Sequence, residues 1–239
     1  MDAEVRAWRV RERARLKEER MHLPSADRSL LTDAIARNLD VVFERLRGTL
    51  GLYWPIQGEF DLRQWAERLR IRRRHTLALP VVVREQAPLE YWQWQPGDPM
   101  TRGFWDIMVP KQGHPIIPDI VIAPLVGFCG FYRLGHGGGY FDRTLAAMRP
   151  KPLAIGVGTE ASRAENFVPQ PHDIPMDVIV TEAAVYRAQN SGASVVRSYF
   201  RRYSLLSTTH AGLEGRLTTT HVDAEIGWAS DSKIRSSLS

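Results

Sequence analysis

Residues 119–143 read DIVIAPLVGFCGFYRLGHGGGYFDR, and this stretch carries the most specific signal in the chain. It begins with a short apolar run at 119–123, which is typical of a buried strand. Four glycines follow within five positions, at 135 and 137–139, and the residues after them predict a helix over 140–149. A strand, a glycine-rich loop and a helix in this order indicate an α/β domain that holds a ligand at the loop.

The glycine-rich loop suits the binding of phosphate groups. Glycines let the backbone adopt positive φ angles and approach a ligand closely, and the free N–H groups at the start of the helix attract anions. Arg133 can add a bidentate contact to phosphate oxygens. A carboxylate at Asp142 would repel phosphates unless a cation intervened, so its expected role is that of a Mg²⁺ ligand.

The residues alone leave an alternative open for this loop. It can be a tight strand-to-helix turn without a ligand, in which Asp142 complements the helix dipole. The spacing fits neither GxxxxGK[ST] nor a clean GxGxxG. An ordinary P-loop and an ordinary dinucleotide site are therefore not predicted.

Periodicity predicts further elements on both sides of the loop. Helices are expected over 3–22, 26–47 and 61–72, with Ser25 and Asp61 as N-caps, and strands over 49–54, 76–83, 89–94, 153–157 and 178–180. Residues 95–118 contain five prolines and are expected to form loops. Because strands and helices alternate, we predict a layered α/β domain with a largely parallel sheet.

The chain divides into a domain and a tail. About 200 residues suit one domain, so residues 1–200 are assigned to it. Residues 201–239 are rich in Ser, Thr and Gly and lack sustained periodicity. We expect them to form a weakly ordered C-terminal tail.

Composition narrows the class of protein. The 239 residues are 44% hydrophobic and 25% charged, which is typical of a soluble globular domain. No apolar run approaches the roughly 18 residues that span a bilayer, and residues 1–20 do not resemble a secretory signal. The single cysteine, Cys129, excludes an intrachain disulfide and fits a reducing compartment. We therefore expect a cytoplasmic protein without a membrane partner.

The positive charge is concentrated near the N-terminus. Residues 1–75 carry 17 Lys and Arg against 12 Asp and Glu, a balance of +5 that equals the net charge of the whole chain. Such a segment can bind nucleic acid, an anionic membrane or a phosphorylated small molecule. The alternative is a solvated helical face with ion pairs such as Glu12–Arg9 and Glu19–Arg15.

Two stretches resemble the 5-formyltetrahydrofolate cyclo-ligases, also called methenyltetrahydrofolate synthetases. Residues 133–143 match the core RLGxGxGYYDR of that family's signature, with Phe141 in place of a tyrosine. Residues 169–182, PQPHDIPMDVIVTE, resemble its C-terminal segment. The resemblance spans roughly residues 5–185, and both motifs are specific.

This resemblance implies a three-layer α/β/α fold and an ATP- and Mg²⁺-dependent ligase. The enzyme would convert 5-formyltetrahydrofolate into 5,10-methenyltetrahydrofolate, with ADP and phosphate as products. Phosphorylation of the formyl oxygen would break the amide resonance, and N10 would then close the ring. The expected partners are these small molecules, the expected state is a monomer, and nucleic acid is not an expected partner.

The same resemblance implies roles for individual residues. Arg133 and Asp142 would be catalytic, and Asp142 and Asp173 would bind Mg²⁺. Contacts to ATP would come from Arg9, Arg13, Arg133, Leu134, Gly135, His136, Gly137, Gly138, Gly139 and Tyr140. Contacts to the folate would come from Trp54, Glu59, Trp105 and Tyr140.

Several of these residues have a second interpretation. Asp173 can instead form a turn before Pro175, the two tryptophans can belong to the core, and Glu59 can be a solvent-exposed loop carboxylate. Cys129 stands where the family usually has an aspartate. Two alternatives remain for the whole chain. It can be a non-catalytic relative that binds folate or nucleotide, or that binds RNA through its basic N-terminus. It can also be an ATP-dependent ligase that acts on another substrate.

Overall fold

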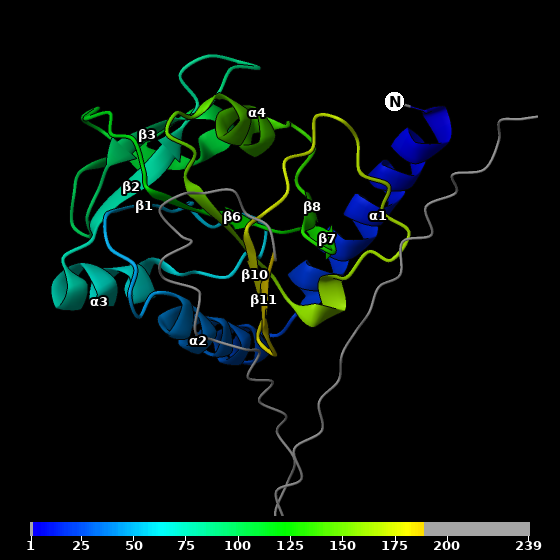
Figure 1. Cartoon of the computed structure of the whole chain (residues 1–239), viewed down its shortest axis with the longest axis horizontal. Coiled ribbons are helices and arrows are strands. Elements are labelled where there is room, and N and C mark those ends of the chain that lie inside the picture. Colours follow the sequence, from blue (N-terminus) through cyan, green and yellow to red (C-terminus); the bar gives the residue numbers. More distant parts are fainter. Residues whose placement is uncertain (1, 189–239) are drawn as a thin grey trace, which may run out of the picture. The chain divides into compact units, whose positions relative to one another are not determined.

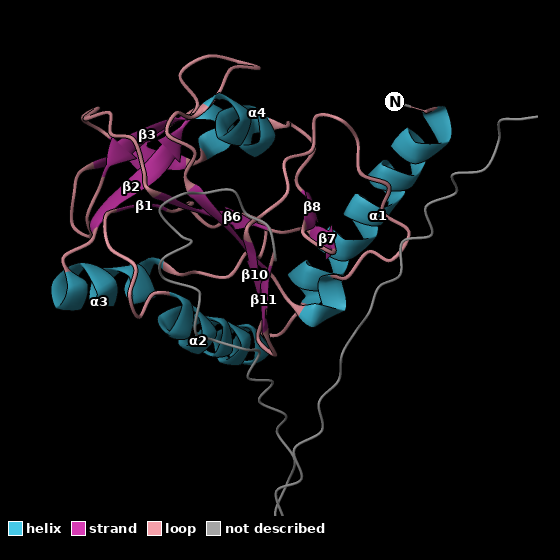
Figure 2. Cartoon of the chain, in the orientation of Figure 1, coloured by secondary structure: helices cyan, strands magenta, loops and turns pink. Residues whose placement is uncertain are grey.

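A seven-stranded sheet forms the centre of the computed structural model, which describes residues 2–188 (Figures 1 and 2). Across the sheet the strands are β11 (Val185–Arg187), β10 (Val178–Val180), β9 (Leu153–Val157), β6 (Ile120–Pro124), β1 (Thr49–Gly51), β2 (Thr76–Val81) and β3 (Glu90–Gln93). The strands from β10 to β2 run parallel, and β11 and β3 pair antiparallel at the two edges. The predicted α/β fold with a largely parallel sheet is confirmed.

Helices cover both faces of this sheet. In Figure 1, α2 (Ser25–Val42) and α3 (Arg63–Arg73) lie on one side and α4 (Tyr140–Ala147) lies on the other. Along β6, Ile120 and Ile122 face the core shared with α2 and α3, whereas Val121 faces the core shared with Leu145 of α4. A strand buried on both faces reads as one continuous apolar run, which explains why the sequence revealed it. The three-layer arrangement is confirmed.

The first helix, α1 (Ala3–His22), lies beside a small hairpin of β7 (Gly127–Cys129) and β8 (Tyr132–Leu134) (Figure 1). Leu16 of α1 packs there in a separate apolar cluster. Both helix ends agree with the prediction. Arg15 pairs with Glu19 as expected, but Glu12 also pairs with Arg15 and not with Arg9. The predicted Glu12–Arg9 pair is wrong because Arg9 is buried against Asp173.

Other predictions of local structure need correction. The helix expected over 26–47 ends at Val42, and its N-cap position is Pro24, which leaves Ser25 inside the helix. The N-cap position of α3 is Leu62, so the prediction of Asp61 as N-cap is wrong by one residue, although Asp61 accepts a hydrogen bond from the backbone N–H of Arg63. The segment expected to be loops, 95–118, contains a hairpin of β4 (Met100–Arg102) and β5 (Met108–Pro110), joined through the 3-10 turn η1 (Phe104–Asp106). A second 3-10 turn is η2 (Glu160–Ser162).

The connections between strands determine where a ligand can bind. From β1 the chain crosses through α3 to β2 on one side, and the next parallel strand, β6, lies on the other side of β1. Ligands of such open sheets bind beyond the carboxyl ends of the strands, where the connections diverge. Among the described helices, none is long and apolar enough to cross a membrane. The expected tail, 201–239, and the boundary at residue 200 lie outside the described residues.

Candidate active site

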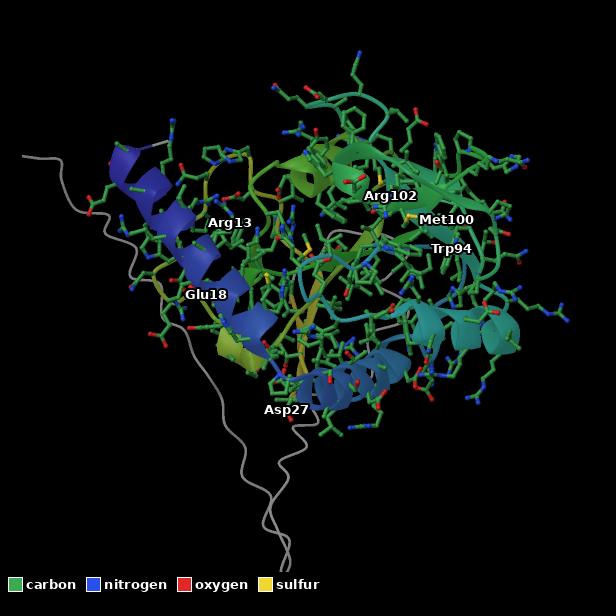
Figure 3. All side chains as sticks on the ribbon, turned by 180° about the vertical axis from the view of Figure 1, so that it is seen from behind. Arg13, Glu18, Asp27, Trp94, Met100 and Arg102 are labelled. Carbon is green, nitrogen blue, oxygen red and sulfur yellow. The ribbon has the colours of Figure 1, made fainter. Side chains whose placement is uncertain are left out.

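A cavity of about 780 Å³ opens at the carboxyl ends of β1, β2 and β6. α1 forms one wall and the segment between β8 and α4 forms another. Figure 3 shows Arg13 on the side of α1 that faces the rest of the domain. Every site residue named from the sequence lines this cavity: Arg9, Arg13, Trp54, Glu59, Trp105, Arg133, Leu134, Gly135, His136, Gly137, Gly138, Gly139, Tyr140, Asp142 and Asp173. The structure thus brings together side chains that are widely separated in the sequence.

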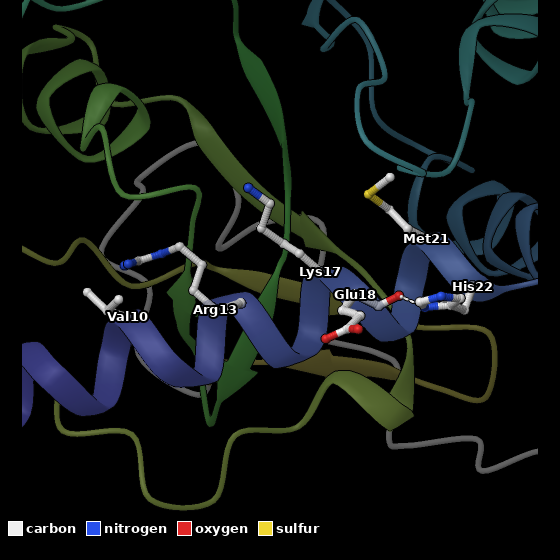
Figure 4. Close-up of a pocket in the computed structure, with 7 residues that line it drawn as sticks. Val10, Arg13, Lys17, Glu18, Met21 and His22 are labelled. Atoms are coloured by element: carbon white, nitrogen blue, oxygen red, sulfur yellow. Dashed lines mark hydrogen bonds between the residues drawn. The ribbon is translucent and has the colours of Figure 1, made fainter.

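Four basic residues of α1 follow one face of the helix, and three of them, Arg9, Arg13 and Lys17, line this cavity. Arg9, Arg13, Lys17 and Arg20 are spaced by three or four positions, which places them on one side of a helix. The Arg13 Nε donates to the Gly135 carbonyl oxygen at 2.7 Å. Figure 4 shows Arg13 and Lys17 extending from the same side of α1. Sequence reasoning found Arg9 and Arg13 but missed Lys17, although the helical period continued through it.

Burial lowers the pKa of three of these cations. The pKa of Lys17 lies below its usual value because burial removes water from its ammonium group and because Arg20 and Arg13 add positive charge nearby. Burial likewise lowers the pKa of Arg13, and the charge of Arg9 adds to the effect. For Arg20, burial again is the main cause of a lowered pKa. Partly buried cations of this kind, set around a cavity, form a favourable environment for an anion.

The glycine loop presents its backbone to the same space. Gly137 and Gly139 have φ angles of 104° and 67°, a region that residues with a Cβ rarely adopt. Gly139 occupies the N-cap position of α4, and no side chain caps the helix there. A Cβ built at Gly137 would lie 3.4 Å from the guanidinium carbon of Arg13. The loop therefore combines free helix-start N–H groups with a cation held close to the backbone.

Arg133 and Asp142 form a buried ion pair at the base of the loop. The Arg133 Nη2 lies 2.6 Å from Oδ2 of Asp142, and the Arg133 side chain is only 4% exposed. The other carboxylate oxygen of Asp142 accepts a hydrogen bond from the backbone N–H of Ile174 at 3.2 Å. This pair fixes β8, α4 and the PHDIP segment relative to one another.

Asp173 is held by an arginine as well. It pairs with Arg9, and its Oδ2 accepts a hydrogen bond from the Gln170 backbone N–H at 2.7 Å. Burial alone would raise the pKa of Asp173, but the hydrogen bonds from Arg9 and Gln170 and the charge of Arg9 outweigh it, so the pKa lies below its usual value. The hydrogen bond to Gln170 closes a local turn, so the turn interpretation and the ion pair both hold for this residue.

The two predicted Mg²⁺ ligands lie close together, because Ile174, which follows Asp173, donates to Asp142. Within residues 2–188, no group of three or more His, Cys, Asp or Glu is arranged to hold a metal. Mg²⁺ in nucleotide sites is commonly bound by one or two carboxylates together with substrate phosphates and water. Two neighbouring carboxylates beside a phosphate-binding loop fit that requirement, although both are now paired with arginines. Their role as metal ligands stays a prediction.

Glu59 lies at another part of the cavity wall, and its side chain is only 3% exposed. Its Oε2 accepts from the Ile56 backbone N–H at 3.0 Å, and its Oε1 lies 2.8 Å from Nε2 of His136. The Arg20 Nη2 is 3.9 Å from the same Oε1. The interpretation of Glu59 as a solvent-exposed loop carboxylate is wrong, because the turn that carries it folds inward.

The two tryptophans differ in their surroundings. Trp54 follows β1 and is half-buried, with the Arg63 guanidinium 4.0 Å from its ring centroid and Trp94 packed edge-on against it. Trp105 is 63% exposed and meets the ring of Tyr140 edge-on at 5.3 Å. Trp54 is therefore partly packed in the core, as one interpretation predicted, whereas Trp105 is not. The ring of Trp105 stays accessible beside the cavity.

Comparisons with known proteins agree with this arrangement. Residues 5–182 match the sequence model of the 5-formyltetrahydrofolate cyclo-ligase family. The chain is 28% identical over 151 residues to the 5-formyltetrahydrofolate cyclo-ligase of Haemophilus influenzae. This alignment covers 59% of this chain and 80% of that protein. The protein of the same name from Escherichia coli K12 is 29% identical over 146 residues, or 58% of this chain and 80% of the relative.

Solved structures show the same likeness. The 5,10-methenyltetrahydrofolate synthetase of Aquifex aeolicus superimposes with a TM-score of 0.66 at 28% identity, covering 77% of this chain and 94% of that one. The 5,10-methenyltetrahydrofolate synthetase of Mycoplasma pneumoniae gives a TM-score of 0.60 at 23% identity, covering 73% and 98% of the two chains. The second likeness, at this lower identity, bears on the fold alone.

Proposed function

The chain belongs to the 5-formyltetrahydrofolate cyclo-ligase family and is therefore a ligase, and we propose that it converts 5-formyltetrahydrofolate into 5,10-methenyltetrahydrofolate with ATP and Mg²⁺. One observation carries the proposal. A single cavity joins a glycine loop and a row of cations to a buried carboxylate and two tryptophans. The glycine loop and the cations suit the phosphates of ATP. The buried carboxylate and the tryptophans suit a flat, nitrogen-rich folate ring.

The reaction needs an activated formyl group. The N5 formyl is an amide, and its resonance makes the carbonyl carbon a poor target for N10. Transfer of the γ-phosphoryl group to the formyl oxygen removes that resonance and turns the oxygen into part of a leaving group. N10 then bonds to the carbon, and phosphate leaves. The protein contributes mainly by holding the reactants in line and by neutralising charge.

We assign the phosphate-binding roles to the α1 side of the cavity. Arg13 and Lys17 would neutralise the ATP phosphates, and backbone N–H groups of residues 135–140 would bind their oxygens. The Arg13 Nη atoms have no hydrogen-bond partner among the described residues, so they are available to a ligand. Arg9 differs, since its guanidinium is bonded to Asp173 and to the Val168 carbonyl oxygen at 3.0 Å. Its proposed contribution is to position Asp173 at the edge of the ATP site.

Arg133 and Asp142 line the same cavity as the glycine loop. We propose that Arg133 stabilises negative charge on the transferred phosphoryl group. Its guanidinium can do so because phosphate oxygens compete with the Asp142 carboxylate for the same N–H groups. Asp142, with Asp173, would hold Mg²⁺, which when bound supplies positive charge to the phosphates. Trp54, Trp105 and Tyr140 would contact the folate rings, and Glu59 would accept hydrogen bonds from folate nitrogens.

The proposal is tested by supplying purified protein with 5-formyltetrahydrofolate. We expect the absorbance of methenyltetrahydrofolate to rise only when Mg²⁺ and ATP are both present, with one ADP formed for each product. Replacing ATP with a non-hydrolysable analogue serves as the control. Absence of product with intact reagents and folded protein would overturn the proposal. The expected cytoplasmic location and monomeric state stay predictions.

A further inference from the structure

We propose that His136, held by Glu59, is the base that takes the N10 proton during ring closure, an assignment that rests on the function proposed above. His136 lies in the glycine loop, and Glu59 lies in the turn after β1, so 77 positions separate them in the sequence. The Nε2 of His136 is nevertheless 2.8 Å from Oε1 of Glu59. The same short contact links the phosphate loop to the carboxylate assigned to the folate.

The hydrogen bond determines which ring nitrogen can act. A carboxylate accepts but does not donate, so in the neutral ring Nε2 carries the hydrogen and Nδ1 keeps its lone pair. Within residues 2–188, no protein group bonds to Nδ1 of His136. A ring oriented by a carboxylate on one nitrogen, with the other nitrogen free to accept a proton, is the arrangement of a general base.

Glu59 itself is less suited to this task. Its side chain is almost fully buried, one oxygen accepts from the Ile56 backbone N–H, and the other is bonded to His136. It is better placed to stabilise the imidazolium that forms when Nδ1 gains a proton. Glu59 is thus a positioning residue for the ring of His136, in addition to any contact with the folate.

The other two carboxylates that line the cavity, and Tyr53, are engaged in contacts of their own. Asp142 and Asp173 are paired with arginines. Tyr53 donates to the Phe60 carbonyl oxygen at 2.6 Å, and burial, with the charge of Glu59, raises its pKa well above the usual value. His172 is 61% exposed and lies beside Asp173 at the edge of the ATP site.

Charges around the dyad come from several elements. Arg20 of α1 lies 3.9 Å from Glu59, and Lys17 of the same helix feels the charge of that carboxylate. Arg13 bonds to Gly135, next to His136 in the loop, and Tyr53 faces Glu59 from the segment after β1. Positive charges of α1 and the negative charge of Glu59 therefore both lie near the imidazole ring.

Atoms and electrons balance in the proposed ring closure. N10 forms a bond to the phosphorylated formyl carbon, and the N10–H bond breaks as the proton passes to Nδ1 of His136. The bond between that carbon and the phosphate oxygen then breaks, and phosphate leaves with the electron pair. The product is the N5–CH–N10 amidinium of the methenyl ring. No oxidant, reductant or further reactant is required.

His136→Gln tests the assignment, because a glutamine amide can still donate to Glu59 but cannot take a proton. His114→Gln is the matched control, since His114 is exposed and does not line the cavity. We expect methenyl formation by His136→Gln to fall about 10²- to 10⁴-fold, while rapid-quench analysis still shows ADP formed in the first turnover. The low-pH decline of kcat/KM should disappear, and added imidazole should restore part of the activity of His136→Ala.

Glu59→Gln gives a second, independent readout. Loss of the carboxylate should destabilise the imidazolium, so the low-pH decline of kcat/KM should move to lower pH. An unchanged rate and pH profile in His136→Gln would overturn the proposal, as would an equal loss of ADP formation and ring closure. Those results require wild-type protein that makes methenyltetrahydrofolate. A wild-type protein that makes none would instead overturn the function proposed above.

Discussion

Arg9 and Asp173, 164 positions apart in the sequence, form a buried ion pair in which Nη1 of Arg9 lies 3.1 Å from Oδ1 of Asp173. Their side chains are 8% and 6% exposed. The pair connects the basic helix α1 to the PHDIP segment, so two separate sequence signals meet in one contact. It holds α1 across the carboxyl ends of the parallel strands and thereby completes a wall of the cavity.

The ion pair of Asp173 makes the stability of the fold depend on pH. Because hydrogen bonds and charge keep the pKa of Asp173 below its value in the unfolded chain, its pairing stabilises the fold fully above the unfolded pKa of about 3.9. That stabilisation is lost as pH falls through the lower folded pKa. In urea titrations, wild type should therefore exceed Asp173→Asn in free energy of unfolding at pH 7, and the difference should shrink below about pH 4. A difference that stays constant down to pH 2 would contradict this assignment.

Lys17 provides a test of the ATP site at a residue that the sequence did not single out. Lys17 lines the cavity, and its pKa is lowered by burial and by neighbouring arginines. Lys17→Met keeps the length of the side chain and removes its charge, so we expect the Kd for ATP to rise about tenfold or more. Calorimetry measures the change, and Lys111→Met, at an exposed site away from the cavity, is the control. Equal ATP affinity in both variants would remove Lys17 from the site.

Gly137 tests the path of the phosphate loop. Its φ of 104° strains any residue with a Cβ, and that Cβ would also reach the guanidinium of Arg13. Gly97, with a φ of 95° and no neighbour within 4 Å of an added Cβ, would be strained in the same way by a side chain, but it does not line the cavity. We expect both alanine variants to lose about 1–3 kcal/mol of stability, but only Gly137→Ala to bind ATP more weakly. If the two variants bound ATP equally well, the loop would not be the phosphate site.

Asp142→Asn separates the metal role from the structural role. An asparagine oxygen can still accept the hydrogen bond from the Ile174 N–H, but the charge that attracts Mg²⁺ is gone. We expect a loss of turnover of at least about 10²-fold, together with a higher Mg²⁺ concentration for half-maximal rate. Circular dichroism and thermal unfolding confirm that the variant is folded. Wild-type rate at low Mg²⁺ would refute the assignment of Asp142.

The sequence predicted the layers of the fold for a physical reason. Residues 120–124 and 153–157 are buried on both faces, so their apolar runs stand out without an alignment. Strands β4, β5, β7, β8 and β11 were missed because each has only three residues and is paired in a hairpin or at an edge. Short strands of that kind depend on tertiary contacts more than on local preference.

The site was predicted less completely. The helical period indicated that Arg9 and Arg13 lie on one face of the helix. It could not reveal that the guanidinium of Arg9 forms an ion pair with Asp173. Nor could it pair His136 with Glu59, since nothing local links residues 77 positions apart. The basic excess of residues 1–75 is also explained in part. Arg9 and Arg20 are buried, and Arg13 and Lys17 line the cavity, so these charges do not form an outer surface for nucleic acid.

The most direct test of the central claim uses 5-formyltetrahydrofolate labelled with ¹⁸O in the formyl group. If the cavity transfers the γ-phosphoryl group of ATP to the formyl oxygen, that oxygen leaves with the phosphate. Mass spectrometry should then find one ¹⁸O in the inorganic phosphate for each methenyltetrahydrofolate formed. Phosphate free of label, formed alongside the methenyl product, would contradict the account.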